Sequence, residues 1–154
     1  MRELAENRKA HFNYDVLERF EAGMVLTGQE VKSIKSGRVN LAGSYVVIKN
    51  EEAFLLNADI PPYQPKNAPP NYDSARLRKL LLNKSEIRYL IGKSQEKHLT
   101  LLPLRVYTKK GKIKLEFGLA KGRQKASKKE LLKKRDIKRE IEIELKAGGF
   151  TPAP

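Results

Sequence analysis

The chain has 154 residues, with 32 Lys and Arg against 18 Asp and Glu, which gives a formal net charge of +14 and a pI near 10.0. This length suits one domain with an appendage, and a composition of 40% hydrophobic and 32% charged residues excludes a wholly disordered chain. No apolar run approaches the about 18 to 20 residues that a bilayer crossing requires, so the basic balance points to RNA, DNA or an anionic membrane surface.

The N-terminal sequence and the cysteine content bear on localisation. Residues 1–9 lack the hydrophobic core of a secretory signal, and the chain contains no Cys. We therefore expect a cytoplasmic protein. The absence of thiols also excludes thiolate zinc sites, iron–sulfur ligation and thiol nucleophiles.

The first predicted elements are a strand and a short helix. Segment 12–26 alternates apolar and polar residues from Phe12 onward, which predicts a long strand with one core face. Thr27 and Glu30 have the spacing of a capping box, in which each side chain binds the other residue's backbone amide. We expect a helix that begins here, buries Val31 and Ile34, and ends at Gly37.

Two pairs of strands are predicted further along the chain. Segments 41–48 and 53–58 are rich in aliphatic and aromatic residues and flank a short polar turn. Segments 102–106 and 113–119 alternate on either side of Lys109–Gly111, which predicts a hairpin.

The region between these two strand pairs is rich in proline and is not predicted to form a strand. Segment 59–73 holds five of the chain's eight prolines, so it cannot form a central strand. Asp73 or Ser74 is expected to cap a helix that continues to Leu81, and a second helix is expected over 85–91.

Together these elements predict a mainly β (β+α) fold. We expect a small closed antiparallel OB-like barrel of about five strands, decorated by about three short helices, over residues 1–122. Residues 123–154 would form a basic C-terminal tail. Composition alone leaves an SH3-like barrel as an alternative.

The tail carries most of the charge. Ten Lys and Arg against two acidic residues between Lys121 and Arg139 contribute +8 of the +14. Such a segment is attracted to phosphate backbones through counterion release, although a solvated charged face is the simpler alternative. A capping-box pattern begins at Ser127, but the apolar seam that follows is narrow, so we expect a tail that is disordered when free and helical when bound. The seam lacks Trp and Phe, which weakens a membrane-surface role.

Catalytic and cofactor chemistry find little support. The only histidines, His11 and His98, are 87 positions apart, and a two-histidine ribonuclease mechanism would need both within reach of one phosphate. Gly23–Gly28 has the glycine spacing of a phosphate loop, but Gln29 stands where that motif requires Lys. We expect no enzyme, no metal site and no cofactor.

Several blocks of the sequence resemble the small protein B (SmpB) family, which binds transfer-messenger RNA in bacterial ribosome rescue. They occur in the family's order over about residues 7–145. The blocks are Asn7-Arg8-Lys9-Ala10, Phe20-Glu21-Ala22-Gly23, Gly28-Gln29-Glu30-Val31-Lys32-Ser33, Ser44-Tyr45, Arg78-Lys79-Leu80-Leu81-Leu82-Asn83, Glu86-Ile87 and Gly118-Leu119-Ala120-Lys121-Gly122.

The resemblance implies an OB-like barrel that binds the tRNA-like domain of transfer-messenger RNA, with a tail that enters the empty mRNA channel of a stalled ribosome. The implied partners are this RNA, the decoding region and mRNA channel of the small subunit, and, through the RNA, elongation factor Tu and alanyl-tRNA synthetase. No membrane is implied, and we expect a monomer. The alternative is a general single-stranded RNA binder with a basic tail.

The resemblance also implies site residues. Glu21, Leu81 and Asn83 occupy the family's RNA-facing positions, although a strand-end carboxylate, a core leucine and a helix-capping amide are the structural alternatives. Arg76, Arg78 and Lys79 are expected to contact phosphates, because burying them unpaired would be costly. The full expected barrel set is Glu21, Lys32, Asn40, Arg76, Arg78, Lys79, Leu81, Asn83, Lys121 and Arg123. Four tyrosines are candidates for base stacking, Tyr14, Tyr63, Tyr72 and Tyr107, although the alternation of its segment favours a core position for Tyr14.

The tail residues expected to contact the ribosome share a basic or capping character. They are Ser127, Lys128, Lys129, Lys133, Lys134, Arg135, Lys138 and Arg139. One departure concerns Ala126–Lys129, which replaces the family's usual aromatic or His followed by Asp-Lys-Arg. Ala126 cannot stack on a ribosomal base, whereas Lys128 and Lys129 keep the charge and Ser127 can still cap, so the sequence leaves open whether the decoding-region contact changes.

Overall fold

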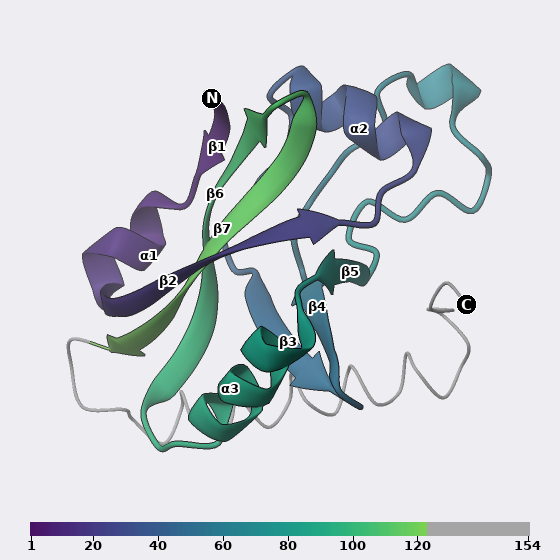
Figure 1. Cartoon of the computed structure of the whole chain (residues 1–154). Coiled ribbons are helices and arrows are strands. Elements are labelled where there is room, and N and C mark those ends of the chain that lie inside the picture. Colours follow the sequence, from purple (N-terminus) through teal and green to yellow (C-terminus); the bar gives the residue numbers. More distant parts are fainter. Residues whose placement is uncertain (123–154) are drawn as a thin grey trace.

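A computed structural model of the chain describes residues 1–122 (Figure 1). The expected tail, 123–154, lies outside the described residues. The strands are β1 (Arg2–Glu6), β2 (Tyr14–Met24), β3 (Tyr45–Lys49), β4 (Glu52–Leu56), β5 (Arg78–Leu81), β6 (Leu99–Lys109) and β7 (Lys112–Gly122). The helices are α1 (Arg8–Asn13), α2 (Gly28–Lys35) and α3 (Lys84–Ser94), with a 3-10 turn at Pro65–Asn67.

Six strands form a closed ring. Strands β6, β3, β4, β5, β2 and β7 follow one another, every pairing is antiparallel, and β7 pairs back onto β6. β1 adds to the end of β6 near the β6–β7 turn, where Arg2 lies opposite Thr108. This closed ring confirms the predicted antiparallel barrel. The ring has six strands where about five were expected, and β1 is a further strand outside the ring.

The interior of the barrel is apolar. Leu80 of β5, Leu115 of β7 and Phe117 of β7 are at most 1% exposed and pack in one cluster. Ile34 of α2 and Leu90 of α3 join this cluster with no exposed surface, so each helix anchors to the barrel through a buried aliphatic residue. Burying each such side chain contributes about 1.5–3 kcal/mol.

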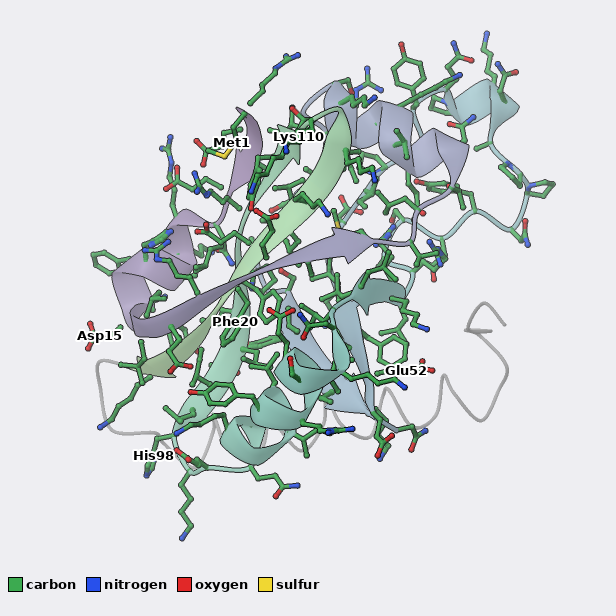
Figure 2. The ribbon with its side chains drawn as sticks, in the orientation of Figure 1. Met1, Asp15, Phe20, Glu52, His98 and Lys110 are labelled. Carbon is green, nitrogen blue, oxygen red and sulfur yellow. The ribbon has the colours of Figure 1, made fainter. Side chains whose placement is uncertain are left out.

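Both predicted hairpins are present and have tight turns. Asn50 and Glu51 join β3 to β4 with φ of 51° and 60°, and Lys110 and Gly111 join β6 to β7 with φ of 52° and 77°. Positive φ at both central residues matches the twist of the flanking strands. Lys110 marks the tip of the long β6–β7 hairpin (Figure 2).

The start of the first strand was predicted wrongly. Phe12 belongs to α1 and is 78% exposed, because the Asn7 side chain accepts a hydrogen bond from the Ala10 backbone amide and begins a helix. β2 starts only at Tyr14. The predicted capping box at Thr27 is confirmed, since Thr27 N donates to Glu30 Oε1 over 2.8 Å and Glu30 N donates back to Thr27 Oγ1.

The helix predicted up to Leu81 is also wrong, since this segment contains strand β5. Leu77, Leu80 and Leu81 have helical spacing, but β5 is needed between β4 and β2 to close the ring. In the strand Leu80 points into the core at 1% exposure and Leu81 points outward at 54%. The second predicted helix is confirmed as α3, which Asn83 caps.

Among residues 1–122, no helix is both long enough and apolar enough to cross a lipid bilayer.

Candidate RNA-binding surface

The strand pair β2–β5 gathers the residues at the centre of the expected site. Gly23 lies opposite Leu81, and because alternate residues share a face, Glu21 lies on the same outer face as Gly23. Gly23 has no side chain, and a Cβ atom built at Gly23 would lie 3.4 Å from Leu81 Cδ1. The exposed Leu81 is therefore not a core leucine, and its apolar side chain lies on the same outer face of this strand pair as Glu21.

Asn83 follows directly, at the start of α3. Its Oδ1 accepts hydrogen bonds from Glu86 N over 2.9 Å and from Ser85 Oγ over 2.8 Å. The helix-capping alternative is thus present in the structure. The side chain is exposed, and its amide nitrogen has no hydrogen-bond partner among residues 1–122, so a donor remains available beside Leu81.

The Glu21 carboxylate is held from one side. Its Oε2 accepts a hydrogen bond from the Tyr107 hydroxyl and lies 3.5 Å from Lys109 Nζ. The Tyr107 hydrogen bond, together with the positive charges of Lys109 and Lys114, lowers the pKa of Glu21 below its ordinary 4.5, although partial desolvation opposes this. Glu21 is therefore an ionised acceptor at neutral pH.

Arg78 does not lie on the surface, and this contradicts its expected role as a phosphate contact. Its side chain is 0% exposed, and Nε donates to Glu30 Oε2 over 2.7 Å. Its remaining nitrogens donate to the backbone carbonyls of Ala58, Ser74 and Arg76. The prediction assumed that burial would leave the guanidinium unpaired, but a buried carboxylate and three carbonyls satisfy it.

Arg76 and Lys79 are partly available. Arg76 Nη2 donates to Glu30 Oε1 over 2.7 Å and to the Val25 carbonyl, and 28% of its side chain is exposed. Lys79 Nζ lies 3.8 Å from Glu52 Oε1 with 22% of its side chain exposed. Arg76 is thus committed largely to the fold, whereas Lys79, on the strand that carries Leu81, retains a weakly paired charge.

The other expected barrel residues lie elsewhere. Lys32 is exposed on α2, and Asn40 is exposed, with its Oδ1 accepting from Ala42 N over 2.9 Å in a turn. Lys121 lies opposite Asp15, at the far end of β2 from Gly23 and about 25 Å along the strand. Figure 2 shows Asp15 at that end. The structure does not bring these three to the β2–β5 pair, and Arg123 and the tail residues lie outside the described part of the chain.

The four tyrosines differ in availability. Tyr107 is 2% exposed, which contradicts its expected role in stacking on a base. Tyr72 is partly buried and donates to the Ile60 carbonyl over 2.6 Å, and Tyr14 packs on the cluster around Ala10. Tyr63 is 36% exposed and carries the Arg38 guanidinium 6.0 Å from its ring centre.

Two functional features were not assigned from the sequence. The sequence places Gly23 in a motif, but only the strand register shows that Gly23 leaves space beside Leu81. The sequence offers Tyr107 as a base-stacking candidate, and no local pattern reveals its hydrogen bond to Glu21, which lies 86 positions earlier. No group of three or more His, Asp or Glu within residues 1–122 is placed to hold a metal ion.

Comparison with known proteins gives consistent matches. Residues 4–147 match the family described as "SmpB protein". The "SsrA-binding protein" of Acaryochloris marina is 50% identical over 94% of each chain, and that of Sulfurihydrogenibium sp. is 52% identical over 93% of each chain. The chain is also similar to one in a solved structure described as "tmRNA-SmpB: a journey to the center of the bacterial ribosome", with a TM-score of 0.68 and 44% identity over 80% of this chain and 87% of the other.

Proposed function

This chain belongs to the SmpB protein family, and on that premise we propose that it binds the tRNA-like domain of transfer-messenger RNA and delivers it to stalled ribosomes for trans-translation. The observation that carries the proposal is sequence identity of about half over nearly the whole length of relatives described as SsrA-binding proteins. The closed barrel that the chain shares with the SmpB structure supports it.

The β2–β5 surface supplies chemistry that suits a folded RNA. The Glu21 carboxylate can accept a hydrogen bond from a 2′-hydroxyl or a guanine edge, the Asn83 amide can donate one, and Leu81 can pack on an unstacked base or a sugar. Lys79 supplies a positive charge for the nearby phosphates. Because a carboxylate repels phosphates and accepts hydrogen bonds, Glu21 favours an RNA that places a hydrogen-bond donor here over a polyanion that does not.

The alternative, a general single-stranded RNA binder, would need several exposed aromatic rings in a row along the barrel strands. Among residues 1–122 the exposed aromatic rings are Phe12 of α1, Tyr63 in the loop after β4 and Tyr89 of α3, and none of them lies on a barrel strand. The described surface therefore favours recognition of a shaped RNA.

The tail completes the proposal. Residues 123–154 would form a basic segment that occupies the empty mRNA channel and contacts the small-subunit decoding region. Its charge suits rRNA phosphates. The protein would act as a cytoplasmic monomer and catalyse no reaction itself, with elongation factor Tu and alanyl-tRNA synthetase joining through the RNA.

The experiment that tests this function is peptide tagging on stalled ribosomes in a reconstituted translation system. The full chain should support tagging, whereas a truncation after Gly122 should bind the tRNA-like RNA with affinity close to that of the full chain and fail to tag. Full tagging by the truncated protein would contradict the role of the tail. Absence of tagging by the full chain would contradict the function itself.

A further inference from the structure

The Glu21 carboxylate lies next to a buried tyrosine from a strand that is not its neighbour. Glu21 is on β2 and Tyr107 is on β6, and β7 lies between these two strands. The Tyr107 hydroxyl reaches across β7 and donates to Glu21 Oε2. Tyr107 is 2% exposed, and the Arg105 guanidinium lies 5.1 Å from its ring centre, so the hydroxyl is held in a fixed position.

The surrounding charges complete this arrangement. Lys109 Nζ lies 3.5 Å from the same Oε2 atom, and Lys114 lies opposite Tyr107 on β7. Glu116, directly opposite Glu21, is held by Arg105 at 3.0 Å and by Arg19 at 2.8 Å. The two arginines neutralise the negative charge of Glu116, which would otherwise repel Glu21. The contacts of the Glu21 carboxylate are with Tyr107 and Lys109.

One oxygen of Glu21 remains available. Both contacts described above are made to Oε2, and Oε1 has no hydrogen-bond partner within residues 1–122. We propose that Tyr107 is a positioning residue for RNA recognition, whose hydroxyl fixes the Glu21 carboxylate so that Oε1 accepts a hydrogen bond from an RNA donor, a 2′-hydroxyl or a guanine edge. This inference rests on the proposed function, because it takes Glu21 to contact the RNA.

The physical reason is pre-organisation. A free glutamate side chain rotates about three bonds, and ordering it on binding lowers affinity, whereas a side chain already fixed in the free protein avoids that loss. The Tyr107 hydrogen bond also lowers the pKa of Glu21 further below its ordinary value, and the charged carboxylate is a strong hydrogen-bond acceptor. Burial and the Glu21 carboxylate raise the pKa of Tyr107 well above its ordinary value, so its hydroxyl stays a donor at any working pH.

A double-mutant cycle on the full chain tests the proposal. Tyr107→Phe removes the hydroxyl and keeps the ring, and we expect it to weaken binding of the tRNA-like RNA by about three- to tenfold. In a Glu21→Ala background, the same change should have no further effect. The matched control is Tyr89→Phe on α3, because the Tyr89 hydroxyl also donates to a carboxylate, that of Glu18 at 2.6 Å, and has no hydrogen bond to Glu21 among residues 1–122. It should leave affinity unchanged.

The possible results distinguish the positioning role of Tyr107 from the RNA contact of Glu21. If Glu21→Ala weakens binding and Tyr107→Phe does not, the positioning role is wrong while the function stands. If Tyr107→Phe weakens binding equally in both backgrounds, its effect is on the whole fold and the proposal is overturned. If Glu21→Ala binds at full affinity, Glu21 is not part of the site.

A second readout does not depend on affinity. The pKa of Glu21, measured from the carboxyl carbon by NMR in the free protein, should rise toward 4.5 in Tyr107→Phe and stay lowered in Tyr89→Phe. An unchanged pKa of Glu21 in Tyr107→Phe would show that the hydroxyl does not hold this carboxylate.

Discussion

Arg78 Nε lies 2.7 Å from Glu30 Oε2, and both side chains are at most 1% exposed. This ion pair joins β5 to α2 across 48 positions of sequence. Arg76 binds the other oxygen of the same carboxylate over 2.7 Å, so Glu30 connects the end of the Pro-rich region to the helix after β2. The Arg78–Glu30 ion pair therefore holds the first residue of β5, the strand that ends at Leu81, in place against α2.

Removing Arg78 should destabilise the barrel. Arg78→Ala leaves the buried Glu30 carboxylate with one cation fewer, and breaking a buried pair in this way costs about 3–5 kcal/mol. Urea unfolding measures the change. The adjacent Lys79→Ala, which removes only a partly exposed pair with Glu52, should change the free energy of unfolding by less than about 1 kcal/mol. Equal effects of the two substitutions would contradict the structural role of Arg78.

The same cluster predicts a pH dependence of stability. Burial raises the pKa of Glu30, but hydrogen bonds from Arg76, Thr27 and Arg78 outweigh it, and the net pKa lies below the ordinary 4.5. Because the folded pKa is lowered, this stabilisation is present above pH 4.5 and is lost as the pH falls through the folded value. The difference in unfolding free energy between wild type and Glu30→Gln should shrink from pH 6 to pH 3. A constant difference over that range would refute this origin.

Leu80 and Leu81 should separate folding from binding. Leu80→Ala leaves a cavity in the core and should lower the free energy of unfolding by about 2–5 kcal/mol, because Leu80 is 1% exposed. Leu81→Ala should change stability by less than about 1 kcal/mol and weaken binding of the tRNA-like RNA, because Leu81 is 54% exposed. Thermal unfolding and fluorescence anisotropy on the same samples give both values. Normal RNA affinity in Leu81→Ala would remove this side chain from the site.

Asn83 has two roles that two substitutions distinguish. Asn83→Ala removes both the cap and the exposed amide, so it should cost about 0.5–2 kcal/mol of stability as well as affinity. Asn83→Ser keeps a capping oxygen and removes the amide donor, so it should retain most of the stability and still weaken RNA binding. Full affinity in Asn83→Ser would mean that the amide does not contact RNA.

How far the sequence predicts this structure depends on how local each interaction is. The two hairpins and the capping box at Thr27 follow from alternation and spacing within a few residues, and all three are present. β5 was missed because its leucines repeat at helical spacing, and only the need to pair with both β4 and β2 makes the segment extended.

The candidate site shows the same limit. Leu81 and Asn83 came from the family resemblance, and the strand register places Leu81 beside Gly23. Arg78 was assigned to the surface because its partner Glu30 is remote in sequence, and local pattern says nothing of a buried carboxylate. Tyr107 was missed as a positioning residue for the same reason, since its contact with Glu21 crosses an intervening strand.

A competition gel shift tests the central claim most directly. The purified full chain is bound to labelled tRNA-like RNA and challenged with an equal length of unstructured single-stranded RNA, at about 0.1 M and about 0.3 M salt. Recognition of a folded RNA by the barrel predicts that the tRNA-like RNA is retained against a large excess of competitor at both salt concentrations. Equal competition by the two RNAs, with both complexes lost in parallel as salt rises, would contradict it and leave only charge attraction.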